Sequence, residues 1–180
     1  MVVFGAPFAR AQSPAARPKP APLPLQHAVE ASGKQMNVRA GFNRASVAPG
    51  GSVDVMVDAT PRARMHVYAP GQPDYLVVDW KIDPSARIKT AAPVYPAAKT
   101  LFLEAISEAA KIYDGPFRVS QRVSVMPSAE VRRLVDTNQP LTLTATLAYQ
   151  ACDDRVCYVP DRVRVTLSIP LANGRASSSK

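Results

Sequence analysis

A sandwich of two antiparallel β-sheets is the fold class that this sequence of 180 residues predicts. Apolar and polar residues alternate over several short segments, as they do in strands with one buried and one solvent-facing side. Segments rich in proline, glycine and aspartate separate these stretches. Helical signals are too few to supply crossover helices between parallel strands. About seven or eight strands of this kind predict an all-β, immunoglobulin-like sandwich.

The N-terminal region is expected to precede the folded domain. Residues 1–12 hold a short apolar stretch and an Ala-Arg-Ala motif, which are typical of the end of a signal peptide, but no basic leader comes before them. Residues 13–35 begin with a proline-rich run, which favours a disordered spacer because proline fixes φ and has no amide hydrogen. The domain itself is predicted for residues 36–172, and residues 173–180 are expected to form a disordered tail.

The predicted strands follow one another through this domain. Val53, Val55 and Val57 alternate with Asp54, Met56 and Asp58 in the first clear segment. Leucines and threonines alternate in the same way over a later segment that ends at the first cysteine. The expected strands are residues 50–59, 65–69, 75–82, 117–126, 141–150 and 162–169.

Two segments carry a helical signal. Residues 101–112 contain good helix formers over about three turns. Residues 128–136 read as about two turns that begin after an N-capping serine, Ser128. Short helices are therefore expected at both places.

Composition and charge exclude two classes of protein. The net charge is +8, but residues 41–180 carry 17 basic and 13 acidic side chains, spread singly, and aromatic residues make up only 7%. Nucleic-acid binding needs basic side chains gathered on one face, so no nucleic-acid partner is expected. No apolar run reaches the roughly 18 residues of a spanning helix, so the chain is not expected to cross a membrane.

The two cysteines, Cys152 and Cys157, have four residues between them in a predicted hairpin turn. Opposed residues in an antiparallel pair lie close enough for a disulfide. A bond across so short a loop stabilises the fold by about 2 kcal/mol, much less than one that closes a long loop. Short, exposed disulfides are typical of labile or catalytic bonds. The pattern leaves three interpretations open: a redox-active pair, a structural brace, and unpaired thiols or metal ligands.

The turn between the cysteines is acidic. Asp153 and Asp154 face only one cation, Arg155, and no helix N-terminus is predicted nearby. Anionic neighbours disfavour a thiolate. We therefore expect thiols without a strongly lowered pKa, which react once a partner docks and takes the proton.

The segment YQACDDRVCYVP, followed by an alternating strand, resembles the N-terminal periplasmic domain of the DsbD thiol:disulfide interchange proteins. That family carries a Y-Q-x-C…C-x-x-P segment at a hairpin near the end of an immunoglobulin-like domain. The segments MHVYAP, VYP and KIYDGPFRVSQRV resemble further parts of the family and occur in its order. The resemblance covers roughly residues 41–171.

The resemblance implies an activity, a location and a set of partners. The family's domain receives electrons from a thioredoxin-like domain, which a membrane-embedded domain supplies. It reduces oxidised periplasmic proteins such as disulfide isomerases and cytochrome c maturation factors. By this resemblance the chain is a periplasmic protein-disulfide reductase without a bound cofactor, whose thioredoxin-like or membrane electron donor is a separate chain. Cys157 would attack the acceptor and Cys152 would release it.

Several side chains are implicated as supporting residues. His66 and Tyr68 are expected to point from one strand face toward the cysteines, where they would shield the sulfurs and relay a proton, or else serve as ordinary buried strand residues. The family covers its sulfurs with a cap-loop aromatic, for which Phe102 is the candidate, with a plain core residue as the alternative. Tyr149 and Tyr158 flank the pair and allow both interpretations.

Two rival functions remain. A non-catalytic immunoglobulin-like binding module would use the disulfide only to hold a hairpin. A redox-sensitive switch or chaperone would change its partner affinity with the state of the bond.

Overall fold

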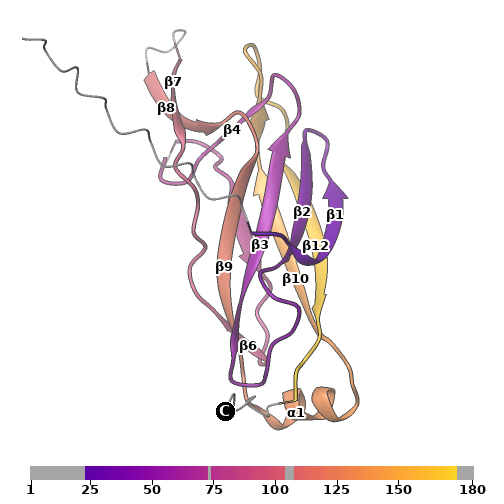
Figure 1. The fold of residues 1–180 in the computed structure, drawn as a ribbon. Helices are drawn as coiled ribbons and strands as arrows, with labels where there is room; N and C mark the ends of the chain where they lie inside the picture. The colour runs from indigo at the N-terminus through magenta and orange to yellow at the C-terminus, as the bar shows by residue number, and fades with distance from the viewer. Residues whose placement is uncertain (1–22, 73, 104–107, 174–180) are drawn as a thin grey trace, which may run out of the picture.

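The structure is a computed structural model, and it describes residues 23–72, 74–103 and 108–173. The predicted signal-like segment, the first ten residues of the predicted spacer and almost all of the predicted tail lie outside these residues. In the described part, twelve strands and one helix form two facing antiparallel sheets and a third, four-stranded sheet at one end (Figure 1). The prediction of an all-β, immunoglobulin-like sandwich is confirmed.

The first sheet has five strands, all paired antiparallel. Its strand order is β1 (Gln26–Ser32), β2 (Met36–Phe42), β3 (Ser52–Pro61), β9 (Phe117–Val125) and β6 (Ile88–Thr90). The second sheet has the order β12 (Asp161–Ile169), β10 (Leu141–Tyr149) and β5 (Asp79–Ile82). The third sheet has the order β11 (Ala151–Cys152), β4 (His66–Tyr68), β8 (Glu108–Tyr113) and β7 (Lys99–Leu103).

The main core lies between the first two sheets. The alternating apolar residues of β3 and β10 point inward, and Val55, Val57 and Leu147 are completely buried. Trp80 of β5 is the largest fully buried side chain of the described residues and is 1% exposed. The period-two pattern of the sequence therefore marks the faces that meet in the core.

The helix α1 (Ala129–Asp136) closes one end of the sandwich, opposite the end with β7 and β8 (Figure 1). The side chain of Ser128 accepts a hydrogen bond from the Val131 amide at 3.2 Å, and Val131 is buried. The serine satisfies an amide that the first helical turn leaves unpaired. The predicted helix and its cap are both present.

The prediction of a helix over residues 101–112 was wrong. Residues 101–103 belong to the strand β7 and residues 108–112 to the strand β8, and the two strands pair with each other. Ala110 and Ile112 of β8 are buried, and Leu101 of β7 packs against the same cluster. Pairing of β8 with β4 buries these alternate residues, and this burial outweighs the local helix propensity.

The predicted spacer extended too far along the chain. Residues 26–32 fall within the range 13–35 but form β1, which pairs antiparallel with β2. Val29 and Ala31 are half-buried and pack against the main core. The folded part therefore starts before residue 36, because the strand hydrogen-bonds with the sheet edge that β2 presents.

Candidate functional site

The cysteine segment begins where the chain passes from one sheet to another. The strand β10 ends at Tyr149 and pairs with β12 and β5 in the second sheet. After Gln150 the strand β11 begins, and it pairs with β4 in the third sheet. We expected Cys152 to end a strand that runs without interruption from Leu141. The break at Gln150 instead places Cys152 at the edge of the third sheet.

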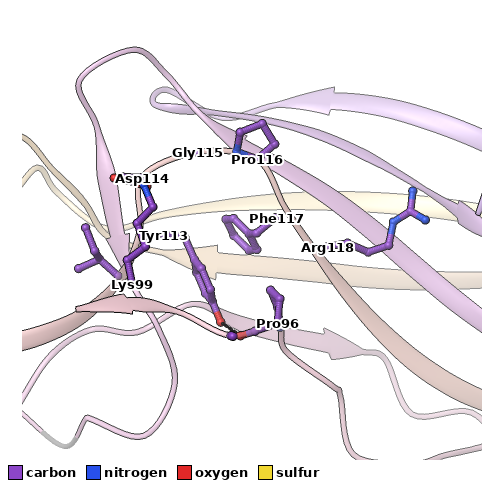
Figure 2. A pocket seen from close by; sticks show the side chains of 10 residues that line it. Pro96, Lys99, Tyr113, Asp114, Gly115, Pro116, Phe117 and Arg118 are labelled. Atoms are coloured by element: carbon purple, nitrogen blue, oxygen red, sulfur yellow. Dashed lines mark hydrogen bonds and ion pairs between the residues drawn. The ribbon is translucent and has the colours of Figure 1, made fainter. Parts of the chain in front are cut away.

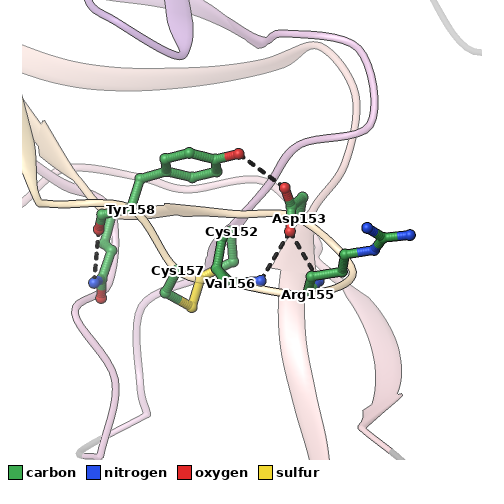
Figure 3. Close-up of a disulfide and its surroundings, with 7 residues drawn as sticks. Cys152, Asp153, Arg155, Val156, Cys157 and Tyr158 are labelled. Carbon is green, nitrogen blue, oxygen red and sulfur yellow. Dashed lines mark hydrogen bonds between the residues drawn. A yellow bond between two sulfur atoms is a disulfide. The ribbon is translucent and has the colours of Figure 1, made fainter.

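Cys152 and Cys157 form a disulfide, and their Cα atoms lie 4.0 Å apart (Figure 3). The two residues also pair as an isolated antiparallel bridge. The pair differs in access to solvent, because Cys152 is 1% exposed and Cys157 is exposed. The expectation that the bond lies exposed at the tip of the turn therefore holds for Cys157 but not for Cys152.

The side chain of Asp153 organises the loop between the cysteines (Figure 3). One carboxylate oxygen accepts hydrogen bonds from the Arg155 and Val156 amides, both at 2.8 Å. The other accepts from the Tyr158 hydroxyl at 2.8 Å. The Val156 amide, with these other donors, holds the pKa of Asp153 below its ordinary value. The same bond to the carboxylate raises the pKa of Tyr158.

Backbone hydrogen bonds close the same loop. The Asp153 amide donates to the Val156 carbonyl at 3.0 Å, and the Tyr158 amide donates to the Ala151 carbonyl at 2.8 Å. The side chain of Gln150 donates to the Tyr158 carbonyl at 2.9 Å, which joins the start of the segment to its end. The path of the loop is therefore fixed by bonds other than the disulfide.

We expect Asp153→Ala to make the disulfide easier to reduce. The substitution removes three acceptor contacts of the loop, so the two thiols meet less often and their effective concentration falls. The midpoint of the thiol–disulfide equilibrium in glutathione buffers should shift so that several-fold less oxidised protein remains at a given buffer ratio.

Two further variants serve as controls for this change. Asp153→Asn keeps the oxygen that accepts from the two amides and should lie between the wild type and the alanine variant. Asp154→Ala replaces an exposed loop carboxylate and should leave the order of the loop unchanged. A midpoint for Asp153→Ala equal to that of Asp154→Ala would show that the carboxylate does not organise the loop.

A small apolar cluster surrounds Cys152 in the third sheet. Its buried members are Tyr68, Ala110, Ile112 and Cys152 itself. Partly buried side chains pack against them, among them Tyr75, whose ring centroid lies 4.1 Å from that of Tyr68. Burial raises the pKa of Tyr68, so its hydroxyl stays protonated near neutral pH. Cys152 thus packs against apolar side chains and the neutral hydroxyl-bearing ring of Tyr68.

His66 lies directly across the strand pair from Cys152. The two residues are register partners in the pairing of β11 with β4. His66 is 6% exposed, and its ring meets that of Tyr68 edge-on with the centroids 5.8 Å apart. The structure therefore brings His66 and Tyr68 together with Cys152, as the sequence led us to expect.

Phe102 does not join this cluster. It pairs with Ala109 across the β7–β8 hairpin and is 60% exposed. Its neighbour Leu101 packs against the cluster instead, since adjacent residues of a strand face opposite sides. The alternative that Phe102 is a core residue was wrong, because the side chain is exposed. Its role as a cap remains a prediction.

Sequence reasoning missed Leu101 and Tyr75. The alternation of side-chain faces along a strand could have identified Leu101 if the segment had been recognised as the strand β7. Nothing in the sequence pattern points to Tyr75, because its contact with Tyr68 is made from a loop.

The two flanking tyrosines have different surroundings. Tyr149 is 3% exposed in the main core, and its hydroxyl donates to Asp161 at 2.9 Å. Burial, with this hydrogen bond, raises the pKa of Tyr149 to about 12. Tyr149 links β10 to β12 and does not belong to the cluster around Cys152. Tyr158 belongs to the cysteine loop through Asp153.

A pocket of about 450 Å³ lies beside the third sheet (Figure 2). Lys99 in its wall is paired with Asp114 at 2.7 Å, and Arg118 is paired with Asp58. The Tyr113 hydroxyl donates to the Pro96 carbonyl at 2.9 Å. These polar groups already have partners, so the pocket presents no obvious unpaired group to a ligand.

The described residues offer neither a metal site nor a membrane-spanning helix. Across residues 23–72, 74–103 and 108–173, no three His, Cys, Asp or Glu side chains gather closely enough to hold a metal ion. The helix in this part of the chain is too short to cross a membrane. The absence of a cofactor remains a prediction.

Comparisons with known proteins agree with this arrangement. A family model described as "Thiol:disulfide interchange protein DsbD, N-terminal" matches residues 34–169. Among solved structures, the N-terminal periplasmic domain of ScsB from Proteus mirabilis superposes with a TM-score of 0.53 at 12% identity. The match covers 77% of this chain and 49% of that one, so the chain spans about half of that structure. At this identity the likeness shows the fold alone.

A second solved structure is less similar. The GAE domain of yeast GGA1 gives a TM-score of 0.43 at 7% identity, over 81% of this chain and 99% of that one. A superposition at this level carries no argument. No curated protein matches the chain.

Proposed function

The chain belongs to the family of the N-terminal domains of the thiol:disulfide interchange protein DsbD, and on this premise we propose that it is a periplasmic protein-disulfide reductase module. The family assigns it broadly to thiol:disulfide interchange. The proposal adds that Cys152 and Cys157 are the exchanging pair and that electrons pass through them to oxidised periplasmic proteins.

The unequal exposure of the two cysteines carries the proposal. Cys157 is exposed, so a docking protein can reach its sulfur, while Cys152 is 1% exposed and adjoins Cys157. The exposed thiolate can therefore attack an acceptor, and the buried one can reach only the mixed disulfide that results.

The exchange has two steps. In the reduced domain, the Cys157 thiolate attacks one sulfur of the acceptor's disulfide, which forms a mixed disulfide and releases the second acceptor sulfur as a thiolate. The Cys152 thiolate then attacks the sulfur of Cys157, which re-forms the Cys152–Cys157 bond and releases the first acceptor sulfur. The acceptor gains two electrons and two protons, and the domain loses them.

The partners follow from this chemistry. The oxidised domain is returned to its dithiol by a donor dithiol, either thioredoxin-like or membrane-embedded. Val156 and Val159 are 55% and 78% exposed on either side of Cys157. Exposed apolar side chains at this position favour a protein acceptor over a small-molecule disulfide. Cytochrome c maturation factors and disulfide isomerases are acceptors of the kind that the family implies.

The location in the periplasm is part of the proposal. Disulfides form and persist in oxidising compartments, and the bacterial periplasm is one of them. A reductase of protein disulfides has substrates there.

The rival role of a structural brace fits the loop less well. Hydrogen bonds of Asp153, Tyr158 and Gln150 already define its path. The closure of so short a loop adds only about 2 kcal/mol to stability. A brace would therefore stabilise a turn that is already held.

The midpoint of the Cys152–Cys157 couple tests the function. We expect the full chain, equilibrated in graded thiol buffers and assayed for free thiols by alkylation and mass measurement, to be half reduced at about −200 to −270 mV. That range is typical of oxidoreductases that cycle. A midpoint below about −300 mV would mark a structural bond and contradict the proposal.

A further inference from the structure

We propose that His66 is the acid–base partner of Cys152, taking the proton of the buried thiol as this residue attacks the mixed disulfide. The inference rests on the proposed function and extends it to a residue outside the cysteine pair. In the reverse direction, when a donor reduces the domain, the same imidazole returns the proton to the sulfur of Cys152.

Strand register places His66 and Cys152 on one face of the third sheet. Cys152 of β11 and His66 of β4 are directly opposed in an antiparallel pair. Opposed side chains project from the same face of the sheet, with Cβ atoms about 4.5–5.5 Å apart. The ring and the thiol are therefore cross-strand neighbours on one face.

A nitrogen of this ring lacks a partner. Among the described residues, Nε2 of His66 is buried and makes no hydrogen bond. Most buried polar side-chain atoms are paired, and an exception calls for an explanation. Three other buried side-chain atoms of the described residues also lack partners, but none of them lies opposite a cysteine: they belong to Gln35, Trp80 and Gln121.

Cys152 needs a base at this position. Its side chain is 1% exposed within an apolar cluster, and burial disfavours the thiolate. A nucleophile that is weak in its protonated form is activated by an adjacent base. Tyr68 cannot act as that base, because its raised pKa keeps the hydroxyl protonated. The remaining buried members of the cluster, Ala110 and Ile112, carry no titratable group.

The charges around His66 suit the transfer in both directions. Burial lowers the pKa of His66 below its ordinary value of 6.5, so the ring is neutral at pH 7 and can accept a proton. Three carboxylates act against this shift and would stabilise the imidazolium once it forms. The charged and titratable groups around the ring are Asp153 and Asp154 of the cysteine loop, Asp114 after β8, Lys99 of β7, which pairs with Asp114, and Tyr68 of β4.

The two steps of exchange can be timed separately. The reduced full chain is mixed with one equivalent of 5,5′-dithiobis(2-nitrobenzoate) in a stopped-flow instrument. The first release of the coloured thiolate reports attack by Cys157, and the second reports attack by Cys152 on the mixed disulfide. We expect His66→Gln to slow the second release about 100-fold at pH 7, the size typical of a lost general base, and to leave the first release unchanged.

The pH profile separates a base from a merely structural residue. In the wild type the second rate should be level near neutral pH and fall below an inflection that lies under 6.5. In His66→Gln, and in His66→Phe, which keeps an aromatic ring without a base, the second rate should rise about tenfold per pH unit through neutral pH. The exposed histidine of β1 supplies the matched control, since His27→Gln should reproduce the wild-type profile.

The outcomes distinguish this inference from the proposed function. An unchanged second rate and profile in His66→Gln would overturn the role of His66 and leave the function standing. If neither His66 variant folds, the wild type alone still tests the inference. A second rate that rises steadily through neutral pH would overturn the role of His66 equally. Failure of the wild type to release either thiolate would instead contradict the proposed function, and this inference with it.

Discussion

Cys152→Ala is expected to leave the protein covalently bound to its acceptor after a single attack. Cys157 can still open the acceptor's disulfide, but no second thiol remains to release it. We expect near-stoichiometric mixed disulfide with a purified, oxidised disulfide isomerase, seen as a band shift on non-reducing gels that dithiothreitol reverses. Multiple turnover should be lost completely. The cost in stability should stay near 2 kcal/mol, the contribution of so short a loop.

Cys157→Ala is the matched control for the trap. It removes the same bond but leaves only the buried thiol, so no adduct should form. An adduct through Cys152 as abundant as that through Cys157 would contradict the assignment of roles. If neither single variant formed an adduct, the proposed reductase function would lose its main support.

Trp80→Ala is expected to destabilise the domain by about 3–5 kcal/mol. Trp80 is 1% exposed in the core between the two main sheets, so the substitution leaves a cavity that neighbouring strands cannot fill. Urea unfolding followed by far-ultraviolet circular dichroism measures the change, since the chain has only one tryptophan. The loss is a large part of the stability of an ordinary domain, about 5–15 kcal/mol.

Two controls accompany this substitution. Trp80→Phe keeps much of the buried volume and removes the indole N–H, which has no partner among the described residues, so it should cost much less. Leu76→Ala truncates a side chain that is 56% exposed and should change stability by less than about 0.5 kcal/mol. A loss for Trp80→Ala no larger than that of Leu76→Ala would show that the core is not centred on this residue.

The parts of the fold that the sequence predicts are those governed by local pattern. The strands β3, β9, β10 and β12 have one buried face, and burial alternates along them as the residues do. The helix α1 starts at Ser128 because a hydroxyl there satisfies a free amide. In these elements the local preference and the tertiary contacts agree.

The remaining elements depend on pairing partners that no local pattern reveals. The segment with Ala110 and Ile112 has the composition of a helix, and pairing with its neighbours β7 and β4 makes it a strand. The strand β1 follows a proline-rich run and is stabilised by the edge of β2. The strand β11 joins the third sheet because the chain leaves the second sheet at Gln150, a change of partner that period-two alternation does not record.

The disulfide of the candidate site was predicted, but the unequal burial of its two cysteines was missed. The spacing of Cys152 and Cys157 indicated a bond across a turn, and the structure has it. The burial of Cys152 could not be foreseen, because it results from the passage of the chain into the third sheet. The choice between Leu101 and Phe102 as the residue that faces the cluster likewise depends on the register of a strand that was expected to be a helix.

The hydrogen bonds within residues 150–158 do not involve the sulfur atoms, so we expect the loop to keep its path when the disulfide is reduced. A partner protein would then meet the same surface in both redox states and could not distinguish them by shape. Under the proposed function, the direction of exchange would follow the relative abundance of oxidised and reduced partners, without any change in this protein.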